Sequence, residues 1–300
     1  MFKLPVIVAP MFLVSTPQMV IEASNAGAIG SFPLLNARPV EKCAEWLLEI
    51  KEALGEKPWA VNLISHRGSN KRYDDDLELI RKHQPPIVIT SLGSPADVIE
   101  IVHGYGGLVY SDVANVRHAK KAAAGGVDGL ILVCAGAGGH GGTLNPFAFI
   151  AGVKEFYDGT IILSGSLSTG QDIAAARLMG ADYAYMGTRF LAAEESNAPE
   201  EYKDMVIEST IEDVLYTDSF SGVHANILIP SLIKQGIDPK ELKPKDEIDL
   251  SHLVDVKAWR DIWSAGQGVT TITKRETMKE IIEALNKEYE EGVQELVRND

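Results

Sequence analysis

The sequence predicts an α/β fold: a closed barrel of eight parallel strands, with a mostly helical second domain inserted after the eighth strand. Eight short apolar runs recur along the first two thirds of the chain, and their starts lie about 20 to 30 residues apart. Amphipathic stretches with helical periodicity separate these runs. Strands that alternate with helices at this spacing indicate βα units and a parallel sheet. Eight such units close into a (β/α)8 TIM barrel.

Local signals support the individual elements. Pro39 precedes a stretch with apolar residues on one face, where a helix would begin, and Asn115 is a good N-cap for a later helix. Ser168 or Thr169 can cap a further helix, which ends at Gly180. The expected strands are 6–9, 28–32, 59–64, 87–92, 107–113, 129–135, 160–164 and 183–188.

After residue 192 the alternation of strands and helices ends. Helices are expected near 199–209 and 225–235, without strands beside them. Thr273 and Glu276 have the spacing of a capping box, and helical periodicity then continues to the end of the chain. A segment that follows the eighth strand emerges at the barrel mouth and could form a lid there. The expected domains are 1–192 for the barrel, 193–269 for a helical lid, and 270–300 for a C-terminal helix that returns to the barrel.

The bulk composition limits the class of protein and its partners. The net charge of −14 argues against nucleic acid or an anionic membrane as the main partner. Cys43 and Cys134 lie far apart and form neither a disulfide framework nor a metal-binding pattern, which favours a reducing, cytoplasmic setting. The chain has no signal peptide pattern and no apolar stretch of membrane-spanning length. We therefore expect a small-molecule partner and no metal; the oligomeric state stays open, a homodimer included.

The loop after the sixth strand is the first candidate for chemistry. It holds five glycines between Gly136 and Gly142 and one polar side chain, His140. Glycines let the backbone pack closely against a flat or charged ligand, and a histidine can exchange a proton near neutral pH. A glycine cluster alone is more typical of a mobile turn with an exposed histidine than of a ligand site. In a parallel barrel, however, this loop lies at the carboxyl ends of the strands, where ligands bind.

Two turns after the seventh and eighth strands predict a phosphate site. Residues 164–166 read Ser-Gly-Ser before a helix, and residues 187–188 read Gly-Thr. Backbone amides and a helix N-terminus at this edge suit a phosphate, although each turn alone could be a simple tight connection. From the opposite side Asn62 could hydrogen-bond to a planar ring system, with Pro10 and Met11 along its edge.

The remaining histidines show no spacing typical of metal or catalytic ligands. His224 could face the barrel mouth from the segment after the eighth strand, and the sequence leaves this open. The histidines interpreted as surface or helix residues are His66, His83, His103, His118 and His252.

Five motifs together carry a resemblance. They are Ala-Pro-Met at 9–11, Val-Asn-Leu at 61–63, Ala-Gly-Gly-His-Gly-Gly at 137–142, Ser-Gly-Ser-Leu at 164–167, and Tyr-Met-Gly-Thr-Arg-Phe at 185–190. In this combination the chain resembles the nitronate monooxygenase family, formerly called 2-nitropropane dioxygenase. It also resembles, less closely, the flavin-dependent enoyl-acyl-carrier-protein reductases.

The resemblance implies non-covalent FMN as the cofactor and a catalytic role for His140. It implies that the FMN phosphate lies on the turns at 165–166 and 187–188, and that Asn62 and Gly138 contact the flavin. The full set of residues expected at the cofactor is Pro10, Met11, Asn62, Asp112, Gly138, Gly139, Ser164, Gly165, Ser166, Tyr185, Met186, Gly187 and Thr188.

The chain departs from the family pattern beside the expected flavin. Many members have a glutamine before the glycine-rich loop and a lysine near the end of the fifth strand; here these places are Val133 and either Ser111 or Asp112. The family usually has two glycines where this chain has Gly165 and Ser166. Loss of a cation and of a polar contact can shift a flavin potential, so the departures bear on the reaction more than on the cofactor.

The resemblance implies an FMN-dependent oxidoreductase. Such an enzyme passes electrons from an alkyl nitronate to FMN and on to O2, with a carbonyl compound and nitrite as products. His140 would position the nitronate and could act as a base on a neutral nitroalkane. The alternative is an NAD(P)H-dependent reductase of a quinone or an enoyl thioester on the same FMN site. A flavin-free lyase that holds a sugar phosphate, or a barrel that stores or senses FMN, would use fewer of these features.

Overall fold

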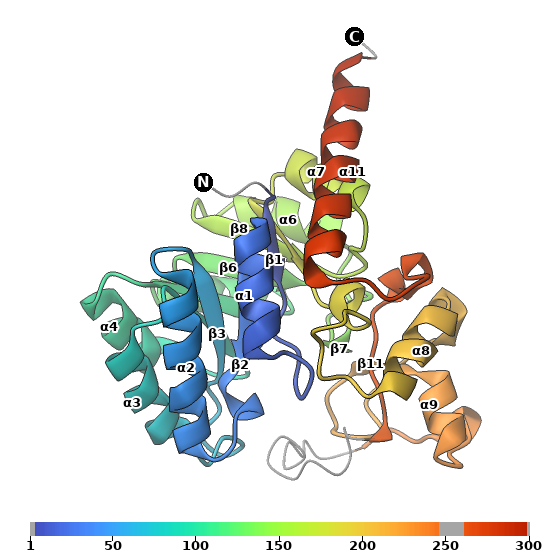
Figure 1. Cartoon of the computed structure of the whole chain (residues 1–300), viewed down its shortest axis with the longest axis horizontal. Coiled ribbons are helices and arrows are strands. Elements are labelled where there is room, and N and C mark those ends of the chain that lie inside the picture. Colours follow the sequence, from blue (N-terminus) through green and yellow to red (C-terminus); the bar gives the residue numbers. More distant parts are fainter. Residues whose placement is uncertain (1–3, 246–260, 299–300) are drawn as a thin grey trace.

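The protein is described by a computed structural model that covers residues 4–245 and 261–298. Eight parallel strands form a barrel in the order β1-β9-β8-β6-β5-β4-β3-β2. A parallel bridge between Ile7 and Ile29 joins β1 to the chain before β2 and closes the barrel. The (β/α)8 barrel and all eight expected strands are therefore confirmed (Figure 1). The strands are β1 (Val6–Val8), β2 (Gly30–Pro33), β3 (Trp59–Ile64), β4 (Ile87–Ser91), β5 (Leu108–Val113), β6 (Gly129–Val133), β8 (Thr160–Ser164) and β9 (Tyr183–Met186).

The barrel strands are buried on both faces. Inward-pointing residues such as Ile89, Ile131 and Ile162 fill the barrel interior. Their neighbours in sequence, such as Leu130 and Leu163, pack against the surrounding helices. A strand that is buried on both faces reads as a continuous apolar run, which is why the sequence located these strands well.

The helices that cover the barrel begin at recognisable capping residues. Thr16 and Asn115 each accept a hydrogen bond from a backbone amide in the first turn of α1 and α5. At α7 the cap is Thr169, which forms a capping box with Asp172, so the threonine of the two predicted candidates is used. The helices are α1 (Pro17–Ala26), α2 (Val40–Leu54), α3 (Tyr73–His83), α4 (Ala96–Gly104), α5 (Val116–Ala124), α6 (Pro146–Lys154) and α7 (Gly170–Met179).

The lid segment (residues 193–245 and 261–269) contains strands as well as helices, which corrects the prediction of a mostly helical domain. The expected helix at 225–235 is in fact a strand followed by a short helix. Four residues are too few for a strand period to be distinguished from a helical one, which explains the error. The segment consists of α8 (Glu200–Glu208), β10 (Val214–Thr217), β11 (Ala225–Leu228), α9 (Ile229–Lys234) and 3-10 turns such as η6 (Gln267–Thr271).

The strands of the lid segment form a small antiparallel sheet with the glycine-rich loop. β11 pairs with β10 on one side and with β7 (Gly139–His140) on the other. The lid segment and the barrel therefore share a sheet rather than forming a clearly separate inserted domain, and the predicted division at 193–269 stays a prediction. In Figure 1 the lid segment lies beside the end of the barrel where β7 and β11 are labelled.

The C-terminal helix α11 (Met278–Arg298) packs on α1 and α7 and projects beyond the barrel at its far end (Figure 1). Its capping residues are Thr277 and Glu280: the Thr277 amide donates to the Glu280 carboxylate at 2.8 Å, and the Glu280 amide donates to Thr277 Oγ1 at 3.2 Å. The capping box predicted at Thr273 and Glu276 is therefore wrong by one turn. None of the described helices is long and apolar enough to cross a membrane.

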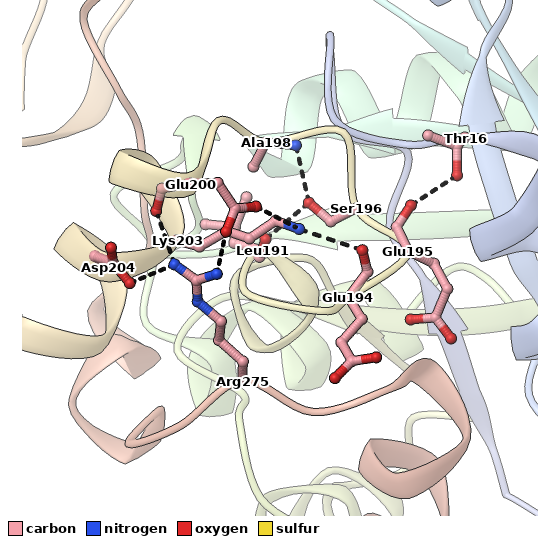
Figure 2. A network of polar contacts seen from close by, with 10 residues as sticks. All are labelled: Thr16, Leu191, Glu194, Glu195, Ser196, Ala198, Glu200, Lys203, Asp204 and Arg275. Carbon is pink, nitrogen blue, oxygen red and sulfur yellow. Dashed lines mark hydrogen bonds and ion pairs between the residues drawn. The ribbon is translucent and has the colours of Figure 1, made fainter.

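A network of polar contacts holds residues 191–204 between the barrel and the chain that leads into α11 (Figure 2). The Thr16 hydroxyl donates to a backbone carbonyl of this stretch at 3.0 Å. Arg275 binds the carboxylates of Glu200 and Asp204, both on α8. The first part of the lid segment is thus attached to α1 on one side and to the start of α11 on the other.

The contact between α7 and α11 leaves no room for a side chain at Gly170. A Cβ placed there would lie 2.3 Å from the backbone nitrogen of Tyr289 and 2.5 Å from the backbone oxygen of Leu285. We expect Gly170→Ala to lower the free energy of unfolding by about 1 to 3 kcal/mol, because the two helices must separate to accept the methyl group. Urea denaturation followed by circular dichroism measures this change.

The matched control is Gly104→Ala at the end of α4. A Cβ at Gly104 meets no atom within 4 Å. This variant should stay within about 0.5 kcal/mol of the wild type, as surface substitutions usually do. Equal stabilities of the two variants would contradict the close packing of α7 on α11.

Candidate active site

A cavity of about 920 Å³ lies at the carboxyl ends of the barrel strands. The lid segment supplies part of its wall, including Tyr202, Trp263 and Ser264, so this segment lies at the barrel mouth, where a lid was expected. The structure brings thirteen of the fourteen predicted site residues to this one cavity. They are Pro10, Met11, Asn62, Asp112, Gly138, Gly139, His140, Ser164, Gly165, Ser166, Tyr185, Gly187 and Thr188.

Met186 is the predicted site residue that does not line the cavity. Its side chain is buried in the core between the barrel and α11, with Phe190 and Ile281. Successive residues of a strand point to opposite faces, so Tyr185 points into the barrel while Met186 points outward. The prediction took the two residues together from one motif and did not apply this alternation.

Three polar side chains form a hydrogen-bonded chain at the cavity floor. Asn62, Ser91 and Asp112 stand at inward positions near the ends of β3, β4 and β5. Asn62 Nδ2 donates to Ser91 Oγ at 2.8 Å, and the Ser91 hydroxyl donates in turn to the Asp112 carboxylate. Sequence reasoning missed Ser91, although its spacing of two from the inward-pointing Ile89 could have revealed it.

Asp112 is the last member of this hydrogen-bonded series, and only one of its two carboxyl oxygens has a hydrogen-bond partner among the described residues. Its buried Oδ1 has no hydrogen-bond partner within residues 4–245 and 261–298. Burial raises the pKa of the Asp112 carboxyl to about 6, although the hydrogen bond from Ser91 acts in the opposite direction. Burial, and then the charge of Asp112, also raise the pKa of Tyr185. An unpaired buried carboxyl oxygen in a cavity wall is suited to a ligand group that donates a hydrogen bond.

The turns after β8 and β9 each contain a glycine, but for different reasons. Gly165 has φ 120°, and a Cβ there would lie 2.8 Å from a backbone carbonyl, so the protein itself requires this glycine. Ser166 has φ 58°, a conformation that favours glycine. At Gly187 an added Cβ would lie 3.5 Å from Ala9 and 3.6 Å from Met11, which is an ordinary contact. The protein alone does not require glycine at 187, and the space beside it suits a ligand.

Hydrogen bonds fix the backbone of the glycine-rich loop, which argues against a mobile turn. The partners all lie in the lid segment. Because the loop has few side chains of its own, its carbonyls and amides depend on these partners. The bonds run from Asn226 Nδ2 to the Ala137 carbonyl (2.6 Å), from the Tyr216 hydroxyl to the Gly141 carbonyl (3.0 Å), from the Gln267 amide to the Gly136 carbonyl (2.9 Å), and from the Gly139 amide to Ser264 Oγ (2.8 Å).

His140 lies on β7 in the cavity wall, where its backbone pairs with Ala225 of β11. Its Nε2 is 3.3 Å from Ser221 Oγ. Ser221 is buried, and its hydroxyl donates to the Val223 carbonyl at 3.0 Å. A hydroxyl has one proton, so the Ser221 oxygen accepts a hydrogen bond from Nε2–H of His140. Ser221 therefore orients the imidazole and places a proton on Nε2. No pattern in the sequence indicates this pairing.

The other histidines lie largely where they were expected. His224, whose position the sequence left open, is not part of the cavity wall: its ring stacks on Tyr216 with centroids 4.9 Å apart and lies 3.8 Å from Asp218. His118 lines an outer part of the cavity, which the sequence did not indicate. His252 lies outside the described residues. Within the part of the chain that the structure describes, no group of His, Cys, Asp and Glu has the arrangement of a metal site.

The residues of the cavity fit a flat ring with a phosphate tail, as in FMN. The turns at 165–166 and 187–188 both line the cavity, and the space beside Gly187 is uncrowded, as a phosphate needs. Thr188 Oγ1 accepts from the Gly266 amide at 2.8 Å, which leaves its own proton available to a ligand oxygen. The floor formed by Asn62 and Asp112 offers polar atoms to the edge of a ring.

Sequence comparison gives relatives of two kinds. The family model described as nitronate monooxygenase matches residues 32–288. The nitronate monooxygenase of Paraburkholderia phytofirmans is 27% identical over 287 residues, which cover 80% of this chain and 77% of that protein. The (3aS,4S,5R,7aS)-5-hydroxy-7a-methyl-1-oxo-octahydro-1H-indene-4-carboxyl-CoA dehydrogenase of Rhodococcus jostii is 26% identical over 229 residues. That match covers 76% of this chain and 64% of the dehydrogenase, which is less than two thirds of its length.

Solved structures share the fold along the whole chain. The nitroalkane oxidase of Streptomyces ansochromogenes superposes with a TM-score of 0.85 at 24% identity, over 98% of both chains. FabK of Thermotoga maritima superposes with a TM-score of 0.84 at 24% identity, over 100% of this chain and 96% of that one. The barrel and its lid segment thus have the same arrangement in proteins of differing activity.

The raised pKa of Asp112 predicts a pH-dependent stability difference. The carboxyl pKa is about 6 in the folded protein against 3.8 for an unperturbed aspartate, so the folded state holds its proton more tightly. The protonated Asp112 side chain therefore stabilises the fold at low pH, and this contribution to the free energy of unfolding is lost as the pH rises from about 4 to above 6. At pH 8 we expect Asp112→Asn to raise the free energy of unfolding by up to about 3 kcal/mol, because the amide cannot ionise.

Urea denaturation of wild type and variant at pH 4 and pH 8 measures this difference. Asp158→Asn, at an exposed position, is the control and should show no such dependence. An Asp112→Asn variant that is no more stable than wild type at pH 8 would show that the carboxylate is already well accommodated.

Proposed function

Because the chain belongs to the nitronate monooxygenase family, we propose that it is an FMN-dependent oxidoreductase that oxidises alkyl nitronates with O2 to a carbonyl compound and nitrite. The observation that carries the proposal is the position of His140. β11 and Ser221 hold this side chain in the wall of the same cavity that contains the polar floor and the turns after β8 and β9. Bound FMN would supply the electron transfer to oxygen, while the protein supplies binding and orientation.

The residues of the cavity have distinct roles in this proposal. Gly165, Ser166, Gly187 and Thr188 would hold the FMN phosphate, and the floor from Asn62 to Asp112 would hold the edge of the ring. His140 would accept the proton from the carbon beside the nitro group of a neutral nitroalkane, or hold a nitronate through a hydrogen bond. The lid segment forms part of the cavity wall and would limit access of water to the reacting atoms.

The charge of Asp112 favours a second candidate function, an NAD(P)H-dependent reductase of a quinone or an enoyl thioester. With a pKa of about 6, Asp112 is mostly ionised at neutral pH. An anionic nitronate in the same cavity would be repelled by this charge, whereas a neutral quinone or thioester would not. The likeness to a CoA dehydrogenase and to FabK supports the same candidate. Anaerobic mixing of the flavoprotein with NADH, NADPH or a nitronate separates the two, because only the true electron donor bleaches the flavin rapidly.

We expect His140→Ala to keep its flavin and fold but to lose activity. Removal of a positioned acid or base typically costs about 10²- to 10⁴-fold in rate. The loss should be larger with a neutral nitroalkane, which must give up a proton, than with the preformed nitronate. Steady-state rates with both substrates between pH 6 and 9 measure this, after flavin content has been determined by absorbance.

His224→Ala is the matched control, because this histidine lies nearby but outside the cavity wall. It should retain the wild-type ratio of the two rates. A His140→Ala variant with full flavin and unchanged rates on both substrates would remove His140 from the mechanism.

Gly187 tests the proposed phosphate position. We expect Gly187→Leu to give a folded protein that binds little or no flavin, because the side chain would fill the space beside the turn. Gly187→Ala should keep more flavin, since its Cβ makes only ordinary contacts with Ala9 and Met11. The absorbance of the purified proteins, before and after incubation with FMN, gives the occupancy. Full occupancy in Gly187→Leu would place the phosphate elsewhere, and a wild type that stays colourless with FMN would refute the cofactor.

A further inference from the structure

The cavity extends well beyond the part assigned to FMN. Past the floor it continues between the β4–α4 connection and the side of α5. We call this part the outer arm; no cofactor contact was predicted in it. The residues that line it are Pro95, Ala96, His118, Lys121 and Gly125.

The helix beside the outer arm is strongly basic in an otherwise acidic protein. The net charge of the chain is −14, yet α5 carries Arg117, His118, Lys120 and Lys121 and no acidic residue. His118 and Lys121 are three positions apart, so they lie on one face of the helix, and both line the outer arm. Lys120 lies instead over the ring of Phe156, at 5.3 Å from its centroid.

His118 and Lys121 both have hydrogen-bond donors to offer to a ligand in the arm. The side-chain oxygen of Asn115, Oδ1, accepts a hydrogen bond from the His118 backbone amide at 2.9 Å. The side-chain nitrogen of Asn115, Nδ2, lies 3.2 Å from His118 Nδ1. Nδ1 therefore accepts a hydrogen bond, and the proton of a neutral His118 is on Nε2. Lys121 forms no ion pair with any acidic residue of the described ranges 4–245 and 261–298. Asp97, the acidic residue in the first turn of α4, is paired with Arg67 at 3.0 Å.

We propose that the outer arm binds the phosphate-bearing end of a long substrate or electron donor whose reactive end lies near His140. A small nitronate has no group that reaches from His140 to α5, and its binding would leave the arm unused. The cavity of about 920 Å³ is at the upper end of the size range of ligand pockets, and its wall extends from the turns at 165–166 and 187–188 to His118 and Lys121 on α5. Adenosine phosphates form the tail of both CoA thioesters and NADPH, so either molecule fits this chemistry.

This inference rests on the proposed flavin site for the reactive end of the ligand, but its test does not depend on turnover. Isothermal titration calorimetry of the flavin-loaded protein would use the adenosine bisphosphate half of CoA, the adenosine bisphosphate half of NADPH, and AMP. We expect one bisphosphate to bind more tightly than AMP, with an affinity that falls as ionic strength rises. The preferred bisphosphate identifies the source of the tail as a thioester or a nucleotide donor.

Charge reversal on α5 locates the binding. Lys121→Glu should weaken binding of the preferred bisphosphate at least about tenfold, and His118→Gln should weaken it to a smaller extent. Lys120→Glu is the control, because it makes the same change of charge on the same helix but outside the arm. Its affinity for the preferred bisphosphate should stay within about twofold of wild type, and its flavin content and rate of nitronate oxidation should be unchanged.

Two results would overturn the proposal. The first is that neither bisphosphate binds at millimolar concentration. The second is that Lys120→Glu and Lys121→Glu weaken binding equally, which would indicate a general effect of charge. Absence of flavin in the wild-type protein would count against the proposed function alone, because the same titrations with wild type, Lys120→Glu and Lys121→Glu would then be made on the flavin-free protein.

Discussion

The active-site loop depends on hydrogen bonds from a distant part of the chain. Residues 136–141 have almost no side chains, so the loop cannot satisfy its own carbonyls and amides. Asn226, Tyr216 and Gln267 donate to it, and Ser264 accepts from it. The strand pairing of β7 with β11 follows from the same contact. The loop therefore takes its working conformation only when the lid segment is folded against it.

A second attachment acts on the turn after β9. Arg189, which follows this turn, pairs with Glu276 at 2.7 Å, with both side chains about one tenth exposed. Burial raises the pKa of Glu276, but hydrogen bonds from Arg189 and Lys274 outweigh this effect and the net pKa is lowered. A buried ion pair adds little net stability, but loss of one partner leaves an unpaired charge, so the pair strongly favours one geometry. The chain before α11 thereby fixes the turn at Gly187.

The sequence predicts those parts of the molecule that depend on local patterns. The eight strands were found because burial on both faces makes each one a continuous apolar run, and the caps at Asn115 and Thr169 because capping is a short-range interaction. The position of the site followed from barrel geometry. Contacts between distant segments were not predictable. No sequence pattern indicates that Ser221 hydrogen-bonds to His140, or that Asn226 hydrogen-bonds to the carbonyl of Ala137. The short strand β11 was misread for the same reason, since its partners are β10 and the glycine-rich loop.

The two ends of the cavity carry charges of opposite sign. Asp112 places a carboxylate at the floor, where the family pattern has a lysine nearby, and Lys121 places a cationic group at the outer arm, beside His118. Buried charges are weakly screened, so the carboxylate acts strongly on whatever occupies the floor. A ligand with a neutral reactive end is not repelled by the carboxylate at the floor, and an anionic tail is attracted to the basic outer arm. A small anion is complementary in charge to the arm alone. The carboxylate of Asp112 and the basic face of α5 thus favour the same kind of molecule, although they lie on different elements and were identified by different observations.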